Sequence, residues 1–126
     1  MTVTTPQQMN EYYNEAFRSA DLDGLVALYE PDALLSPQPG HVVKGREEIR
    51  KRLGGLLVLK GTLRADNQTC VELDDLALLH ASWQFTGTAP DGRSVEMGGV
   101  SSKVVRRQPD GTWLYVFDLP FGGVTA

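Results

Sequence analysis

Residues 79–86, Leu-His-Ala-Ser-Trp-Gln-Phe-Thr, alternate strictly between apolar and polar side chains. Successive side chains of a strand point to opposite faces, so Leu79, Ala81, Trp83 and Phe85 share one face of an extended chain. An alternation of this kind is typical of an antiparallel sheet with one buried face. The stretch therefore predicts a sheet whose inner face carries two large aromatic side chains.

Turn signals on both sides of this stretch divide the second half of the chain into strands. Pro-Asp-Gly occurs at 90–92 and again at 109–111, and Asp74-Asp75 lies upstream. Such residues are typical of the tight turns that join antiparallel strands. The expected strands cover 63–73, 76–88, 94–107 and 112–119. Together they predict a four-strand antiparallel meander.

The first half of the chain has a helical period instead. Apolar residues recur at Met9, Tyr12, Tyr13, Ala16, Phe17 and Ala20, the spacing of one helical face. Thr5 is the expected N-cap of this helix, followed by Pro6 at the first helical position and a capping-box Gln8. The sequence predicts a helix that begins after Thr5.

Two further helices and one short strand are expected before the meander. Asp21 can cap a second helix that carries Leu22 to Tyr29 and stops at Pro31, because residues before proline avoid the helical region. A short strand is expected at 33–36 and a loop at 37–40. Gly45 opens a third helix with acidic residues in its first turn and the basic run 50–52 later, an order that suits the helix dipole.

This order predicts an α+β fold in one domain that spans residues 1–126. A sheet with one apolar face must be covered, and the three N-terminal helices supply the cover. A strongly bent sheet wrapped around helices leaves a cavity between the layers. Aromatic and Met side chains around such a cavity favour a small apolar ligand.

Composition excludes several classes of function. The net charge is −4 with both signs interspersed, so the basic surface that nucleic acid requires is missing. Cys70 is the single cysteine, and His41 and His80 lie far apart in the sequence, so we expect no metal site and no cofactor. No apolar stretch approaches the ~20 residues that span a bilayer, and the N-terminus lacks a signal-peptide pattern, so a cytoplasmic protein is expected.

Three motifs resemble a known family. Residues 21–33, DLDGLVALYEPDA, resemble the second helix of ketosteroid isomerase and of the wider nuclear-transport-factor-2-like (NTF2-like) superfamily. Residues 43–49, VKGREEI, resemble the entry to the third helix, and 110–118, DGTWLYVFD, resemble the last strand of the SnoaL-like (DUF4440) branch. The resemblance implies an NTF2-like cone, with three N-terminal helices packed on a curved, mostly antiparallel sheet. Because the superfamily hosts many activities, it does not specify a reaction.

The resemblance suggests catalytic residues only in part. Tyr13 matches the tyrosine that donates to the developing enolate oxygen in the isomerase, although simple packing is the alternative for this side chain. The two isomerase carboxylates would fall at Pro37 and near Ser101, and neither residue can replace them. We therefore do not expect ketosteroid isomerase activity.

Asp118 matches the last-strand carboxylate of the SnoaL-like branch and is the second catalytic candidate. In a regular strand Asp118 points away from Trp113, Tyr115 and Phe117, so it and these aromatic residues cannot line one cavity without a bulge. An Asp at the sheet edge or in a subunit contact is the alternative.

The remaining site predictions follow from strand parity. Lys103 shares a face with Met97 and Ser101, where it could pair with a carboxylate or meet a ligand; a strand-end lysine in solvent is the alternative. The expected ligand contacts are Trp83, Phe85, Met97, Ser101, Lys103, Trp113 and Tyr115.

Three hypotheses for the function stay open. The first is an isomerase-, cyclase- or dehydratase-like enzyme that acts on a hydrophobic carbonyl compound. The second is a module that binds an apolar metabolite without turnover, and the third is an interaction module. Whether the chain is an enzyme is left open. A homodimer through the outer sheet face is expected, because closed two-fold pairs are the commonest oligomers.

Overall fold

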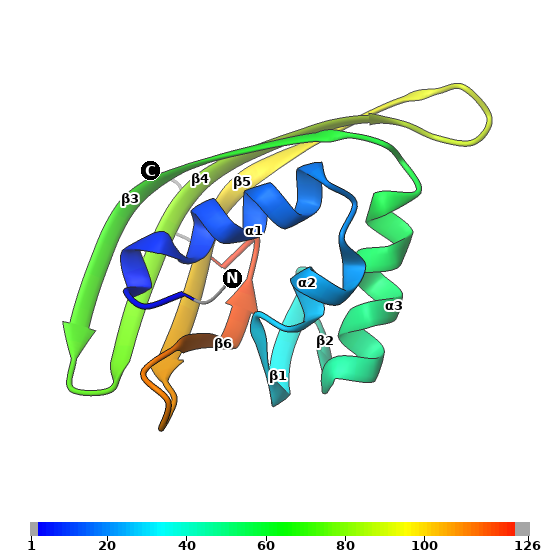
Figure 1. Cartoon of the computed structure of the whole chain (residues 1–126). Helices are drawn as coiled ribbons and strands as arrows, with labels where there is room; N and C mark the ends of the chain where they lie inside the picture. Colours follow the sequence, from blue (N-terminus) through cyan, green and yellow to red (C-terminus); the bar gives the residue numbers. More distant parts are fainter. Residues whose placement is uncertain (1–2, 123–126) are drawn as a thin grey trace.

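A curved sheet of six strands in the order β2-β1-β6-β5-β4-β3 forms the frame of the molecule in a computed structural model, which describes residues 3–122 (Figure 1). The strands are β1 (Tyr29–Gln38), β2 (His41–Lys44), β3 (Thr62–Leu73), β4 (Leu76–Thr88), β5 (Ser94–Arg107) and β6 (Trp113–Leu119). Neighbouring strands are antiparallel except β1 and β6, which are parallel. The predicted α+β cone with a mostly antiparallel sheet is confirmed.

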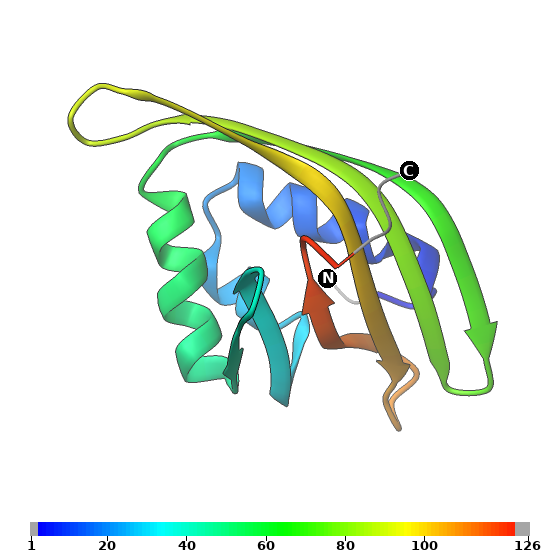
Figure 2. The same ribbon diagram turned by 180° about the vertical axis from the view of Figure 1, so that it is seen from behind.

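Three helices pack on the inner face of this sheet: α1 (Met9–Arg18), α2 (Leu22–Val26) and α3 (Arg46–Leu57). The long strands β3, β4 and β5 bend over α1, and their outer face is seen from behind in Figure 2. Along β4 the inner residues Ala77, Leu79 and Phe85 are buried, whereas Leu76 and Leu78 on the outer face are exposed. The alternation that predicted a one-sided sheet is therefore present in the structure.

Helix α1 buries the face that its periodicity predicted. Met9, Tyr13 and Phe17 are spaced four residues apart and are all buried. Thr5 is the N-cap and Pro6 the first helical residue, as predicted, but Pro6–Gln8 form a 3-10 turn before α1 and Thr5 makes no side-chain capping bond, so the predicted capping box is absent. The backbone carbonyl of Thr5 accepts the backbone N–H of Gln8 instead. The chain thus enters α1 through a tighter turn than a capping box requires.

Asp21 caps α2 as expected, since its carboxylate accepts the backbone N–H of Gly24 at 2.9 Å. The predicted end of that helix is wrong. The helix ends at Val26, and β1 begins at Tyr29 and continues through Pro31. Proline is tolerated there because the pairing of β1 with β6 is interrupted between Tyr29 and Leu34, so no ladder bond is lost.

The loop predicted at 37–40 is shorter in the structure. β1 extends to Gln38, which pairs with His41 in the additional strand β2. Gly40 forms the turn with a φ of 79°, a conformation that favours glycine. A strand of four residues next to two prolines carries too little alternation to be predicted.

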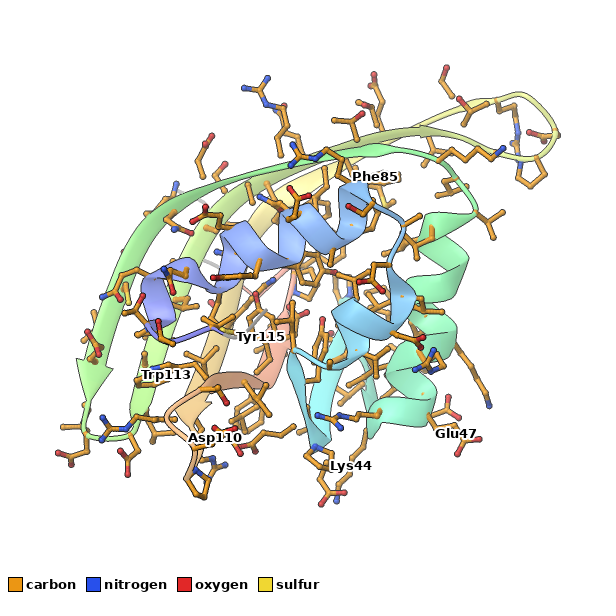
Figure 3. The ribbon with its side chains drawn as sticks, in the orientation of Figure 1. Lys44, Glu47, Phe85, Asp110, Trp113 and Tyr115 are labelled. Carbon is orange, nitrogen blue, oxygen red and sulfur yellow. The ribbon has the colours of Figure 1, made fainter. Side chains whose placement is uncertain are left out.

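Helix α3 begins after Gly45, as predicted, and buries Ile49 and Leu53. Arg46 in its first turn donates to the carbonyl of Tyr29 from Nε at 2.8 Å and from Nη2 at 2.6 Å. Arg46 thus ties α3 to the start of β1. In Figure 3 Tyr115 lies between the sheet and the helices, whereas Glu47 of α3 points outward. Within residues 3–122, no helix combines the length and the apolar character that a bilayer crossing needs.

Candidate functional site

A bulge in β6 turns Asp118 toward the inside of the cone. Val104 pairs with Phe117 and Val105 pairs with Tyr115, so Val116 has no partner on β5. The extra residue reverses the parity of the strand beyond it. Tyr115 and Asp118 are consequently both buried, at 0% and 1% exposure, while Phe117 is 40% exposed on the outer face. The bulge thus lets Tyr115 and Asp118 both face the inside of the cone, which a regular strand would not allow.

Two neighbours hold the Asp118 carboxylate. The hydroxyl of Tyr29 donates to Oδ2, and Nζ of Lys103 lies 3.6 Å from Oδ1. Oδ1 is buried and has no hydrogen-bond partner among the described residues. Asp118 is therefore fixed through one oxygen and has the other available as an acceptor.

Lys103 lies on the inner face, the first of the two alternatives for this residue. It is 8% exposed and pairs directly with Asp118 in the β5–β6 ladder. Its Nζ lies 4.5 Å from the centre of the Tyr13 ring and 4.7 Å from that of Tyr115. Aromatic faces attract cations at these distances, which offsets part of the cost of burying an ammonium group.

The three tyrosines around the ion pair are neutral hydrogen-bond donors. Burial raises the pKa of Tyr13, Tyr29 and Tyr115 well above the ordinary phenol value, and the negative charge of Asp118 raises each pKa further. Their hydroxyl groups consequently keep their protons at pH values where a free phenol would ionise.

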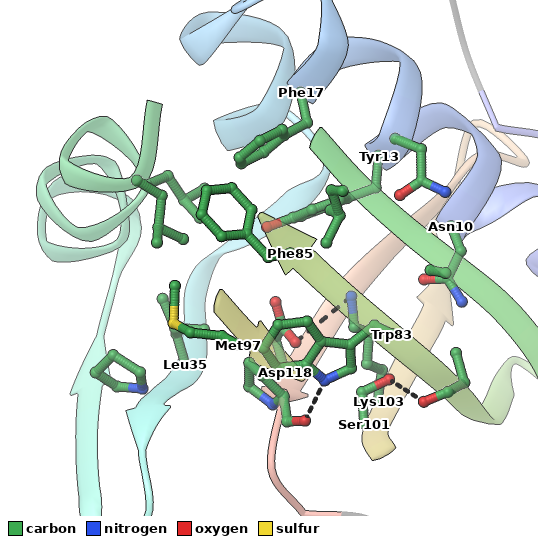
Figure 4. A pocket seen from close by; sticks show the side chains of 18 of the residues that line it. Asn10, Tyr13, Phe17, Leu35, Trp83, Phe85, Met97, Ser101, Lys103 and Asp118 are labelled. Atoms are coloured by element: carbon green, nitrogen blue, oxygen red, sulfur yellow. Dashed lines mark hydrogen bonds and ion pairs between the residues drawn. The ribbon is translucent and has the colours of Figure 1, made fainter. Parts of the chain in front are cut away.

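A cavity of about 190 Å³ opens beside this cluster, between α1, α3 and the inner faces of β4 and β5. Figure 4 shows Tyr13, Lys103 and Asp118 approaching it from three different elements. Its apolar wall comprises Phe17, Leu35, Pro37, Leu53, Leu56, Leu63, Ala65, Ala81, Trp83, Phe85, Met97, Pro120 and Phe121. Its other lining residues are Asn10, Tyr13, Asn14, Arg52, Ser101, Lys103 and Asp118. The site is therefore a mostly apolar hollow with a few polar groups in its wall.

A family model for the SnoaL-like domain matches residues 9–116. The chain belongs to the SnoaL-like domain family. A search of the curated proteins finds no match to this chain. The family assignment accordingly rests on the matched model and agrees with the motifs at 21–33, 43–49 and 110–118.

Solved structures share the fold of this SnoaL-like domain. An NTF2-like superfamily protein from Salmonella enterica is 20% identical with a TM-score of 0.80, and the match covers 94% of this chain and 89% of that chain. A ketosteroid isomerase-like protein from Erwinia carotovora atroseptica is 20% identical with a TM-score of 0.75 over 89% and 88% of the two chains. A candidate dehydratase of the NTF2-like family from Streptomyces avermitilis is 19% identical with a TM-score of 0.72 over 89% of each chain. At such identities the likeness concerns the fold alone.

The SnoaL-like domain brings most of the predicted site residues together. Seven of them line the cavity: Tyr13, Trp83, Phe85, Met97, Ser101, Lys103 and Asp118. Trp113 and Tyr115 do not line it. Tyr115 packs edge-on against Tyr13 in the core, with 6.2 Å between the ring centres, and Trp113 borders a separate hollow beside α1 and α2.

Ser101 and Pro37 both line the cavity of the SnoaL-like domain. The hydroxyl of Ser101 donates to the carbonyl of Ala81 at 3.3 Å.

Among residues 3–122, Asp118 is the only acidic side chain in the lining, and no group of three His, Cys, Asp or Glu residues could hold a metal ion. Any proton acceptor with a carboxylate in this cavity is therefore Asp118.

Four polar residues at or near the cavity were not predicted as site residues, and one of them is Arg52 of α3. Asn10 accepts from the hydroxyl of Tyr115 at 3.2 Å, and the buried Oδ1 of Asn14 has no partner in the described chain. Asn10 lies three residues before Tyr13 and four before Asn14 on α1, so helical spacing could have identified both. Tyr29 contacts Asp118 only because β1 and β6 are parallel neighbours, and no local pattern predicts that pairing.

Proposed function

We propose that this SnoaL-like domain binds a small apolar carbonyl compound in the cavity and transfers a proton on it, with Asp118 as the base. The observation that carries this proposal is the inward Asp118, whose buried Oδ1 lacks a hydrogen bond beside an apolar hollow. A carboxylate is a suitable general base when it is held within reach of an acidic proton. Tyr29 supports this role, because its bond to Oδ2 fixes the direction of the carboxylate.

The proposed reaction begins with transfer of a proton from the carbon next to the carbonyl group to Oδ1 of Asp118. The electron pair left behind moves to the carbonyl oxygen, where donors must stabilise the negative charge. Tyr13 and Lys103 line the cavity together with the base and carry the donors proposed for this role, a phenol and an ammonium group. Burial and the charge of Asp118 raise the pKa of Tyr13, so its phenol stays protonated beyond the pH at which a free phenol ionises.

The walls of the cavity support the proposed class of ligand. Aromatic and aliphatic side chains form most of the lining, which suits an apolar body. Lys103 and Asp118 carry opposite charges, so the part of the cavity beside this pair favours a neutral group that can accept a hydrogen bond. The volume of about 190 Å³ limits the ligand to a small molecule.

Exchange of the protons next to the carbonyl group of cyclohexanone in D2O, followed by NMR, tests the proposal. The chain is expected to accelerate exchange, and Asp118→Asn is expected to abolish the acceleration. Tyr13→Phe should slow exchange by about 10²-fold, the effect of removing one donor to an oxyanion. Tyr12→Phe is the matched control, because Tyr12 lies on the same helix outside the cavity. Acceleration that survives both Asp118→Asn and Tyr13→Phe would show that the site is elsewhere.

Binding without turnover is the second candidate function. It is favoured by Pro37 and Ser101, which line the cavity at the positions where the resemblance to ketosteroid isomerase would require carboxylates. In that case cyclohexanone or a larger apolar ketone would raise the melting temperature without any exchange. A ligand-dependent rise in melting temperature that Asp118→Asn leaves unchanged would support this candidate.

We also propose that the chain forms a homodimer through the outer face of the sheet. Val71, Leu78, Val104 and Phe117 are successive partners across β3, β4, β5 and β6 and form one apolar row. Val71, Leu78 and Phe117 in this row are 56%, 39% and 40% exposed. A row of this kind can pair with its own copy about a two-fold axis.

A further inference from the structure

We propose that Lys103 forms a covalent imine with an aldehyde or ketone bound in the cavity. This inference rests on the proposed carbonyl-binding function and adds a nucleophile to it. An imine would make the cavity a site for amine chemistry, in which the ligand is held by a bond to the protein. The ligand class is a small apolar aldehyde or unhindered ketone.

Lys103 differs from the other lysines of the chain in its surroundings. The sequence contains four, and Lys44, Lys51 and Lys60 are exposed. Lys103 is 8% exposed and lines the cavity, so a bound carbonyl compound meets this amine and none of the other three. Lysines that form imines in proteins are typically removed from water in this manner.

The partners of Nζ leave it free to react. Among the described residues Nζ makes no hydrogen bond; it lies over two tyrosine rings and 3.6 Å from the unpartnered Oδ1 of Asp118. Two buried charges are costly to keep when water is displaced. Transfer of one proton from Nζ to Oδ1 removes both charges and produces the neutral amine that attacks a carbonyl group. Asp118 is therefore placed to activate Lys103.

Lys103 and Asp118 together supply and accept every proton that moves in the proposed reaction. The Nζ lone pair attacks the carbonyl carbon, a C–N bond forms, and the electrons of the C=O π bond move to oxygen, which takes the proton from Asp118. Asp118 then accepts a proton from nitrogen, which gives a neutral carbinolamine. The C–O bond breaks as C=N forms, and the departing hydroxyl takes the proton back from Asp118 and leaves as water. One ammonium and one carbonyl group thus become one iminium and one water, with Asp118 returned to its carboxylate form.

The surroundings of the ammonium also suit the iminium product. The positive charge stays on Nζ, within reach of Asp118 and over the rings of Tyr13 and Tyr115. Aromatic faces attract substituted ammonium groups as well as the lysine ammonium itself. The iminium also acidifies the neighbouring C–H group, which Asp118 could then deprotonate. The inference therefore joins the base of the proposed function to a covalent anchor.

Reductive trapping on the intact, unsubstituted chain tests this inference, and two lysine variants serve as controls. The protein is incubated with benzaldehyde and sodium cyanoborohydride, which reduces an iminium to a stable secondary amine, and the modified lysine is located by peptide mass spectrometry. One benzyl group is expected on Lys103, at a rate at least about tenfold above that of each exposed lysine, because the cavity concentrates the aldehyde. Lys103→Met should lose this adduct, and Lys51→Met is the matched control that should keep it.

The possible outcomes distinguish failure of the imine proposal from failure of the carbonyl-binding proposal. Equal labelling of Lys44, Lys51 and Lys60 with none on Lys103 would overturn the imine. If benzaldehyde raises the melting temperature while Lys103 stays unmodified, the imine is wrong and the carbonyl-binding cavity stands. If the aldehyde neither raises the melting temperature nor labels Lys103, the imine and the proposed function both fail.

Discussion

Lys103 and Asp118 face each other directly across the β5–β6 ladder, with Nζ 3.6 Å from Oδ1 and both side chains nearly excluded from solvent. The pair exists because Val116 is bulged out of register just before Asp118. Buried pairs of this kind contribute little net stability, since each charge loses its hydration. An acid and an amine at the wall of a cavity are therefore better explained by chemistry or binding than by stability.

The first prediction concerns the coupling of these two charges. Lys103→Met or Asp118→Leu alone should each lower the free energy of unfolding by about 3–5 kcal/mol, because each leaves one buried charge unpaired. The double variant should cost clearly less than the sum of the two, as measured by urea unfolding. The exposed pair Arg93 and Asp91 is the control, where the coupling should stay below about 1 kcal/mol. Additive costs for Lys103 and Asp118 would mean that the two charges do not interact.

The second prediction concerns alkaline pH. The folded chain raises the pKa of Tyr13, Tyr29 and Tyr115, so it holds these protons more tightly than the unfolded chain does. Their contribution to stability is therefore complete below about pH 10 and is lost as the pH rises above it, by up to about 1.4 kcal/mol per pH unit for each phenol. The urea midpoint should fall steeply above that pH, and Tyr29→Phe should reduce the slope. Phenolate absorbance that develops near pH 10 from all four tyrosines of the folded chain would contradict this.

The third prediction concerns the cap of α2. Asp21→Ala should lower the free energy of unfolding by about 1 kcal/mol, because the backbone N–H of Gly24 loses its acceptor. Asp21→Asn keeps an acceptor at the same place and should lose only a few tenths. Urea unfolding of both variants measures the difference. Equal losses in the two variants would show that the cap bond is not the cause.

The fourth prediction concerns the outer face of the sheet. Light scattering at micromolar concentration should give the mass of a dimer for the unmodified chain and of a monomer for Phe117→Lys, which places a charge in the apolar row. Val42→Lys is the control, since Val42 is exposed on β2 and lies outside that row. A monomeric unmodified chain would refute the proposed dimer.

Strands that combine strict alternation with clear turns could be predicted from the sequence. The bounds of β4 and β5 agree with the predicted ranges, because Pro-Asp-Gly and Asp-Asp turns delimit a period of two. Parity also placed Lys103 on the Met97 face. The first half was predicted less well, because β2 is short and Pro31 lies within a strand where its pairing is interrupted.

The alternation of side chains along a regular strand was insufficient to predict which way Asp118 points. One unpaired residue, Val116, decides whether Asp118 faces the cavity or the solvent, and no residue type in 113–118 marks it as a bulge. The contact between Tyr29 and Asp118 depends on a parallel pairing of segments 89 residues apart. Such long-range pairings are set by the packing of the whole sheet, so a local pattern does not contain them.

Mapping a bound ligand by NMR tests most directly whether the cavity beside Asp118 is a ligand site. Cyclohexanone is titrated into the 15N-labelled chain while the backbone amide signals are recorded. We predict that the shifted signals gather around Tyr13, Ser101 and Lys103 on the inside of the cone and leave Val71 and Leu78 unchanged. Shifts confined to the outer face of the sheet, or no shifts at ligand saturation, would contradict a ligand site in this cavity.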